Sequence, residues 1–149
     1  MAKEFVYVAV QQVQPGKPIL LNNSIPNQCC GNSDVYHENE TGIVTLAAPR
    51  RGKACNQFAD YKVTLIGNIA VPTTETVGPI SIAMVQNGEV IPASEAIVTP
   101  AAVDEYFNVT VSKIVRIPRT CGCEDISIDN TSTIPINIQN VNMTVDRVS

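Results

Sequence analysis

The sequence predicts an all-β protein in which roughly eight to ten antiparallel strands form a two-sheet sandwich. Segments rich in valine and isoleucine recur along the chain, and several show the two-residue alternation of half-buried strands. Turn signals separate these segments, and the one helix-like stretch, residues 99–107, is interpreted as a connection between strands. With 149 residues, of which 44% are hydrophobic, the chain is expected to form a single domain, residues 1–149, with a sizeable core.

The N-terminal half contains three predicted strands. Residues 4–13, EFVYVAVQQV, are rich in valine and aromatic residues and are expected to form one strand. Residues 42–48, GIVTLAA, predict a short strand after a glycine turn. In residues 60–71, DYKVTLIGNIAV, apolar and polar residues alternate, so one face of this strand is expected to be buried. The apolar residues of that face include Tyr61, Val63 and Leu65.

Residues 78–98 predict a β-hairpin. Two apolar runs, GPISIAMV and EVIPASEAIV, flank Asn87-Gly88. Both turn residues tolerate positive φ, which a type I′ turn requires at its two central positions. The runs ISIAMV and EAIV are apolar on both faces, so either loops or a second copy of the chain are expected to cover their outer face.

The C-terminal segment shows a change of phase. Residues 106–117, YFNVTVSKIVRI, predict a long strand, and residues 124–130, EDISIDN, predict a short one. After them, apolar residues alternate in one phase over residues 134–138 and in the opposite phase over residues 141–145. Both sets can face one core only if the register slips by one residue, so a bulge or a tight turn is expected near residue 140.

In order and spacing, these segments resemble the jelly roll shared by tumour necrosis factor and the globular heads of complement and collagen-like proteins. The resemblance covers residues 42–148 and is carried by GIVTL, FADYKVTLIGNIAV, ISIAMVQNGEVIPAS, NVTVSKIVRIPRT, EDISIDNTS and INIQNVNMTVDRV. It is nearest to the C-terminal domains of bacterial spore-surface collagen-like glycoproteins and to short proteins of Firmicutes and their phages. Residues 1–41 stand where those glycoproteins have a Gly-X-Y stalk, and are expected to form their own strands and a cysteine-bearing loop.

The resemblance implies a threefold homotrimer in which sheet faces pack around an axis. Only 16% of the residues are charged, which is low for the surface of a soluble monomer and also favours self-association. We therefore expect a structural protein, held by a shell or coat protein on the exterior of a phage capsid. A spore or cell surface is the alternative location, and a soluble or secreted binding module of the lectin or receptor-ligand type is the alternative function.

The composition favours neither a nucleic-acid partner, nor a membrane, nor catalysis. The net charge is −4, and no lysine or arginine cluster runs along one face to bind phosphates. The apolar stretches are shorter than a membrane span, and the first residues read as an ordinary strand rather than a signal peptide. His37 is the single histidine, and neither a nucleophile elbow nor a nucleotide-binding loop is present, so we expect no enzyme and no cofactor.

Five cysteines, Cys29, Cys30, Cys55, Cys121 and Cys123, lie in predicted loops. Disulfides, free thiols and a metal site are three interpretations that the spacing leaves open. The odd number means that at least one thiol stays free or pairs between chains. Cys29, Cys30, Cys121 and Cys123 could hold zinc through four thiolates, although the usual C-x-x-C spacing is absent.

We expect at least one disulfide, most plausibly between Cys55 and either Cys29 or Cys30. It would close a loop of about 25 residues and stabilise the fold by roughly 3 kcal/mol, because it restricts the unfolded chain. Such a bridge would also indicate maturation in an oxidising compartment. Mass spectrometry of the alkylated, unreduced protein should then find fewer than five alkylated cysteines. Alkylation of all five would refute the bridge, and a metal retained under native conditions would support the zinc interpretation.

Overall fold

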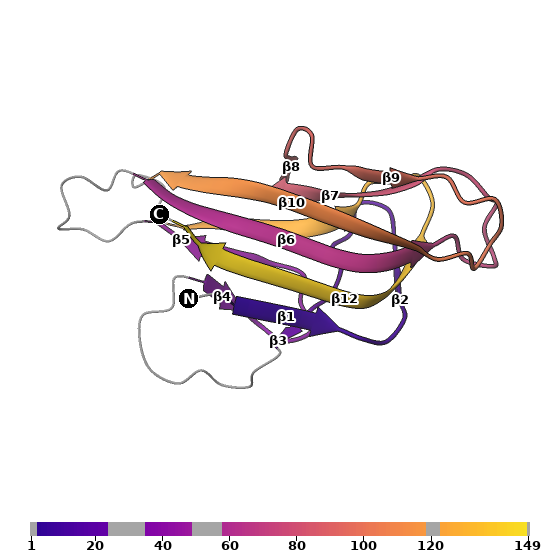
Figure 1. Ribbon diagram of the computed structural model, residues 1–149, viewed down its shortest axis with the longest axis horizontal. Coiled ribbons are helices and arrows are strands. Elements are labelled where there is room, and N and C mark those ends of the chain that lie inside the picture. The colour runs from indigo at the N-terminus through magenta and orange to yellow at the C-terminus, as the bar shows by residue number, and fades with distance from the viewer. Residues whose placement is uncertain (1–2, 24–34, 49–57, 119–122, 149) are drawn as a thin grey trace.

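The computed structural model describes residues 3–23, 35–48, 58–118 and 123–148. Twelve strands in this part of the chain form two six-stranded antiparallel sheets that pack face to face (Figure 1). The strands are β1 (Lys3–Tyr7), β2 (Gln11–Val13), β3 (Asn22–Asn23), β4 (Val35–His37), β5 (Val44–Ala47), β6 (Phe58–Ala70), β7 (Ile80–Gln86), β8 (Glu89–Val90), β9 (Ala96–Val98), β10 (Phe107–Pro118), β11 (Cys123–Asn130) and β12 (Ile136–Arg147).

The two sheets draw on alternate parts of the chain. The first, here called the β6 sheet, has the order β10-β6-β12-β1-β3, and β2 also pairs with β12. The second, the β7 sheet, has the order β4-β5-β11-β7-β8, and β9 also pairs with β7. The chain therefore crosses between the sheets after β3, β5, β6, β9, β10 and β11, as in a jelly roll. This architecture confirms the predicted two-sheet sandwich.

The apolar core fills the space between the sheets. On β6, Tyr61, Val63 and Leu65 are buried and alternate with more exposed residues, which confirms the predicted alternation. The hydroxyl of Tyr61 donates to the carbonyl of Ala47 at 2.7 Å, so the polar end of this buried side chain has a partner. The largest fully buried side chains come from both sheets and include Leu46, Ile80, Ile117, Ile126 and Ile128.

β12 contains the register shift that the sequence predicts near residue 140. The pairing with β6 slips between Gln139 and Asn142, so Asn140 and Val141 together oppose Gly67 alone. Asn140 adopts φ 53°, and its amide donates to the carbonyl of Val8 at 3.1 Å. This is a β-bulge, and it turns the residues on both sides of it toward the same core. The buried residues of β12 are Ile136, Ile138, Val141, Met143 and Val145.

The prediction of one strand over residues 4–13 is wrong, because this segment divides into β1 and β2. β1 pairs with the part of β12 after the bulge, and β2 pairs with the part before it. Between β1 and β2, Val8 and Val10 are exposed. The bulge on the partner strand thus interrupts the N-terminal segment as well.

The β7–β8 hairpin has the predicted turn. Asn87 and Gly88 adopt φ 49° and 85°, and two residues connect the paired ends of β7 and β8. The second strand of this hairpin is shorter than predicted, because β8 ends at Val90 and β9 begins only at Ala96. Between them, the hydroxyl of Ser94 accepts a hydrogen bond from the backbone amide of Met84 at 3.0 Å. This bond stands in for the one that a neighbouring strand would make with β7. These divisions, together with β3 and β4, bring the strand number above ten.

Both faces of β7 are covered within a single chain. Ile80, Ile82 and Met84 face the core, and the intervening Ser81, Ala83 and Val85 are only 7%, 0% and 6% exposed. Ser81 is held by the loop that follows β11, where its backbone amide donates to the hydroxyl of Ser132 at 2.7 Å. The sequence allows either loops or a second copy of the chain to cover the outer face of β7. In the structure, loops of the same chain cover it.

The N-terminal connection packs tightly on the turn before β5, and this contact can be tested by substitution. A Cβ added at Gly42 would lie 2.5 Å from Cβ of Pro18 and 2.6 Å from the carbonyl oxygen of Ile19. Because one obstacle is backbone, Gly42→Ala should destabilise the protein by about 1–3 kcal/mol. Gly78→Ala is the matched control, since a Cβ at Gly78 meets nothing within 4 Å.

Urea unfolding of both variants, at one protein concentration, measures the difference. The urea midpoint of Gly42→Ala should fall clearly. The free energy of unfolding of Gly78→Ala should stay within about 0.5 kcal/mol of that of the parent protein. Equal midpoints for the two variants would contradict the close approach of these segments.

Candidate functional site

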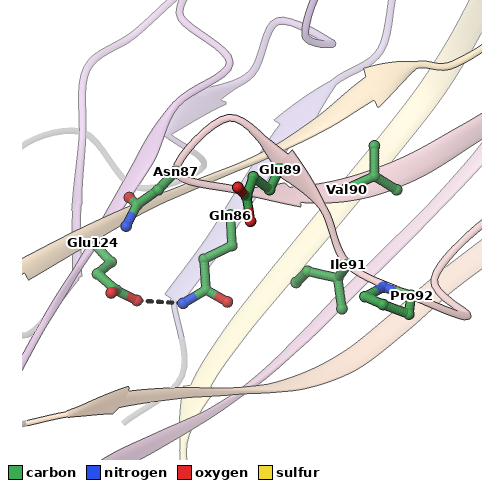
Figure 2. A pocket seen from close by; sticks show the side chains of 7 residues that line it. All are labelled: Gln86, Asn87, Glu89, Val90, Ile91, Pro92 and Glu124. Atoms are coloured by element: carbon green, nitrogen blue, oxygen red, sulfur yellow. Dashed lines mark hydrogen bonds between the residues drawn. The ribbon is translucent and has the colours of Figure 1, made fainter.

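Two grooves flank the β7–β8 hairpin. The first, here called the hairpin groove, has a volume of about 490 Å³ and is shown in Figure 2. The second, the Asp129 groove, has a volume of about 450 Å³, and Val90 lines both. The hairpin groove is lined by Gln86, Asn87, Glu89, Val90, Ile91, Pro92 and Glu124. The Asp129 groove is lined by Gly16, Val85, Gly88, Val90, Asp129, Asn130, Thr131 and Ser132.

The hairpin groove combines carboxylates and carboxamides with an apolar side. The amide of Gln86 donates to the carboxylate of Glu124, which joins β7 to β11 at the groove (Figure 2). Asn87 is fixed on β11, because its side-chain oxygen accepts the amide of Asp125 at 2.9 Å. Ile91 and Pro92 lie on the opposite side of the groove from Glu124 (Figure 2). This lining can accept hydrogen bonds from hydroxyl or ammonium groups.

The Asp129 groove lies on the outer face of the β7 sheet. Ile126 and Ile128 of β11 face the core, so the side chain of Asp129 points to the other side of the sheet. The apolar wall of this groove is formed by Val85 and Val90, which are opposite each other on β7 and β8.

Asp129 is half-buried. Burial raises the pKa of its carboxyl group above the usual range, and the hydrogen bond that it accepts from the hydroxyl of Ser127, at 2.7 Å, opposes this shift. Among the described residues, the ion pair within salt-bridge distance joins Arg116 to Asp60, and none involves Asp129. The groove therefore contains a carboxylate whose charge no described basic side chain compensates.

The sequence-predicted cysteine sites stay predictions. Cys29, Cys30, Cys55 and Cys121 lie outside the described residues. Cys123, at the start of β11, is exposed and forms no disulfide with any other described residue. Within the described ranges, no group of three or more His, Cys, Asp and Glu side chains could hold a metal ion.

His37 lies inside the sandwich. Its Nε2 is 2.8 Å from the carbonyl oxygen of Thr41, and its ring centroid is 4.6 Å from that of Phe5. The ring therefore fixes the turn before β5 and packs on β1.

No helix among the described residues is long and apolar enough to cross a membrane.

Sequence reasoning missed both grooves. Their lining residues come from separate segments of the chain that only the sheet pairing brings together. Asn87-Gly88 is the signal that could have indicated them, because its turn places Gln86 and Glu89 side by side. The charge of Asp129 gave no such signal, since its groove depends on which side of β11 faces outwards.

Comparison with known proteins supports the fold. No protein-family model matches the chain, and no curated protein matches its sequence. Among solved structures, the globular domain of zebrafish complement 1qA protein is 13% identical with a TM-score of 0.58, and the match covers 99% of this chain and 97% of that chain. The PRD1 vertex protein P5 is 12% identical with a TM-score of 0.48, over 99% and 96% of the two chains. The EclA C-terminal domain, a sugar-binding protein, is 11% identical with a TM-score of 0.40, over 91% and 77%.

The complement comparison confirms the predicted jelly roll of the tumour necrosis factor type. At 13% identity it shows the fold alone. The other two structures are less similar, with TM-scores below 0.5. The nearer resemblance to spore-surface and phage proteins has no sequence match behind it and stays a prediction.

The raised pKa of Asp129 predicts how stability depends on pH. The folded protein binds this proton more tightly than the unfolded chain, so Asp129 lowers stability as the pH rises above the ordinary aspartate pKa of about 3.9. Asp129→Asn removes this cost and keeps an oxygen that accepts from Ser127. Thermal unfolding at pH 7 should show the variant more stable by at most about 1 kcal/mol, since solvent screens a half-exposed charge.

The advantage of Asp129→Asn should disappear near pH 3, where both proteins are neutral at this position. Asp125→Asn, on the same face of β11, provides the control, because Asp125 is exposed. A variant that is less stable than the parent protein at pH 7, or a pH-independent difference, would contradict the assignment.

Proposed function

We propose that the protein is a non-enzymatic structural protein that forms a homotrimer and decorates the surface of a larger assembly. The exterior of a phage capsid, where a shell or coat protein would hold it, is the location that we favour, and a spore or cell surface is the alternative. The observation that carries this proposal is the outer face of the β6 sheet, which lacks charge over its central area.

The outer face of the β6 sheet carries short polar side chains and isoleucines. Cross-strand hydrogen bonds order them: the hydroxyls of Thr64 and Ser112 are 3.0 Å apart, and the amide of Asn108 donates to Asn68 at 3.2 Å. We call this surface the uncharged face. It consists of Thr64, Ile66, Asn68, Asn108, Thr110, Ser112, Ile114, Asn142 and Thr144 from β6, β10 and β12.

A face of this composition suits an interface between copies of the chain. Charged residues are depleted in the centres of protein interfaces, and polar, charged residues gather at the rim. Here the charges begin at the margins, with Glu4 on β1 and with Lys62 and Asp146 on neighbouring strands. Threonine, serine and asparagine are short, so little side-chain entropy is lost when they are buried.

One end of the uncharged face carries a compact charged pair. The guanidinium of Arg116 donates to both carboxylate oxygens of Asp60 at 2.8 and 3.1 Å, and it lies 4.7 Å from the centre of the Phe58 ring. Because each charge already has a partner, this end would form a polar rim without leaving an unpaired charge in the interface.

A trimer of this kind would place its threefold axis on a local threefold axis of a shell. We treat residues 1–149 as one jelly-roll domain in this proposal, with residues 42–148 as its core, because β1 and β2 pair with β12. If the uncharged face lies between copies, the β7 sheet faces the medium.

A soluble binding module is the second candidate function. Both grooves favour it, because they open beside the same hairpin and each presents a carboxylate near apolar side chains. A lectin or a receptor ligand would use such grooves, and either role is compatible with a trimer.

Oligomeric state provides the test of the proposed trimer. Light scattering at micromolar concentration should give three times the chain mass of 16.0 kDa. Thr64→Lys should raise the dissociation constant of the trimer by about 100-fold or more, because it buries a second ammonium beside that of Lys62 in the proposed interface.

Thr45→Lys is the matched control. Thr45 also lies within a strand and makes one side-chain hydrogen bond, to Asp125 at 2.7 Å, but it belongs to the β7 sheet. This variant should stay trimeric. A monomeric parent protein would refute the trimer, and a trimeric Thr64→Lys variant would refute the proposed face.

A further inference from the structure

We propose that the Asp129 groove binds a primary alkylammonium group, as carried by the lysine side chain of a partner protein. The ammonium would bind the carboxylate of Asp129, and the methylene chain would lie against Val85 and Val90. This binding requires the groove alone, and neither the proposed trimer nor its location.

The carboxylate of Asp129 determines the charge of the ligand. It is half-buried and lines the groove, and the structure places no described ammonium or guanidinium within salt-bridge distance of it. Lys17 follows Gly16 of the groove lining, but no ion pair joins it to Asp129. Burial has already reduced the hydration of this charge. A cation that enters the groove would therefore compensate it.

The hydrogen bonds around Asp129 favour an ammonium over a guanidinium. One carboxylate oxygen, Oδ1, already accepts the hydroxyl of Ser127, which leaves the other oxygen for a ligand. A guanidinium binds best as a fork to two carboxylate oxygens, whereas an ammonium is a compact charge with three separate donors. A carboxylate with one oxygen already hydrogen-bonded thus suits the ammonium.

Two hydroxyls that line the groove can accept the remaining donors. Thr131 donates to Glu95 at 3.0 Å, and its hydroxyl lies 2.7 Å from that of Ser81. Ser132 donates to the carbonyl of Ser81 at 3.2 Å and accepts the amide of Ser81 at 2.7 Å. Both hydroxyl protons are used inside the protein, and Ser81 uses one lone pair of each oxygen. The second lone pair of each oxygen is left to accept from a ligand. Asp129, Thr131 and Ser132 together offer oxygen atoms only.

The apolar wall determines the rest of the ligand. Val85 and Val90 are directly opposite each other on β7 and β8, and Val90 is exposed. Lysine side chains lie along apolar surfaces with their methylene groups and keep the charged end on polar partners. The groove offers these two environments next to each other, and its volume of about 450 Å³ accommodates such a side chain.

An NMR titration of the ¹⁵N-labelled full chain tests this proposal. The probes are Nα-acetyl-lysine N-methylamide, butylammonium chloride and, as a neutral control, Nα-acetyl-norleucine N-methylamide, all at constant ionic strength. The two cationic probes should shift the amides of Gly16, Val90, Asp129 and Thr131 saturably, with dissociation constants on the order of 1 mM. Equal binding of both would show that the alkylammonium alone is recognised, and tighter binding of the capped lysine would favour a protein side chain.

Two substitutions complete the experiment. Asp129→Asn should weaken the binding of the cationic probes by about 10-fold or more, because the charge-assisted hydrogen bond is lost. Asp125→Asn removes a carboxylate from the same strand but outside the groove lining, and should leave the binding unchanged. Equal binding by Asp129→Asn and the parent protein, equal shifts with the norleucine probe, or the absence of saturable shifts would each overturn the proposal.

Discussion

The bulge in β12 is the constraint on which the rest of the β6 sheet depends. Asn140 and Val141 occupy the space opposite Gly67, so the isoleucines before the bulge and the valines after it face one core. In a regular pairing, one of the two halves would turn its apolar residues to solvent. A side chain at position 67 would crowd the bulge, since a Cβ there would lie 3.2 Å from Ile138. The same bulge divides the N-terminal segment into β1 and β2, because each pairs with one half of β12.

Much of this fold could be predicted from the sequence, because it follows from alternation and turn chemistry. The phase change near Asn140 and the positive φ at Asn87 and Gly88 are local properties of the chain. The break at residues 91–95 is a local turn that contains Pro92 and a positive φ at Ala93. The break at residues 8–10 could not be predicted, because it follows from the bulge in the partner strand. The grooves were missed for the same reason: β-pairing, and not the chain, places Val90 beside Asp129. The predicted cysteine sites lie largely outside the described residues.

The two outer faces of the sandwich differ in their chemistry. The β6 sheet presents hydroxyls, carboxamides and isoleucines in a continuous array, with charges at its margins. The β7 sheet presents aspartates, and its residues line both the hairpin groove and the Asp129 groove. Under the two proposals, contact between copies would belong to one sheet and contact with ligands or partners to the other. The intrachain cover of β7 agrees with it, since no second copy is needed to bury that strand.

Hydroxyl-radical footprinting of the unmodified protein measures most directly whether the uncharged face lies between copies. In a single chain, Ile66 and Ile114 on this face are 42% and 66% exposed, and Ile97 on the β7 sheet is 62% exposed. A trimer built on the uncharged face predicts that oxidation of Ile66 and Ile114 falls far below that of Ile97 at micromolar concentration, and rises on dilution to monomers. Oxidation of the three isoleucines in proportion to their exposure in the single chain, at every concentration, would contradict the account.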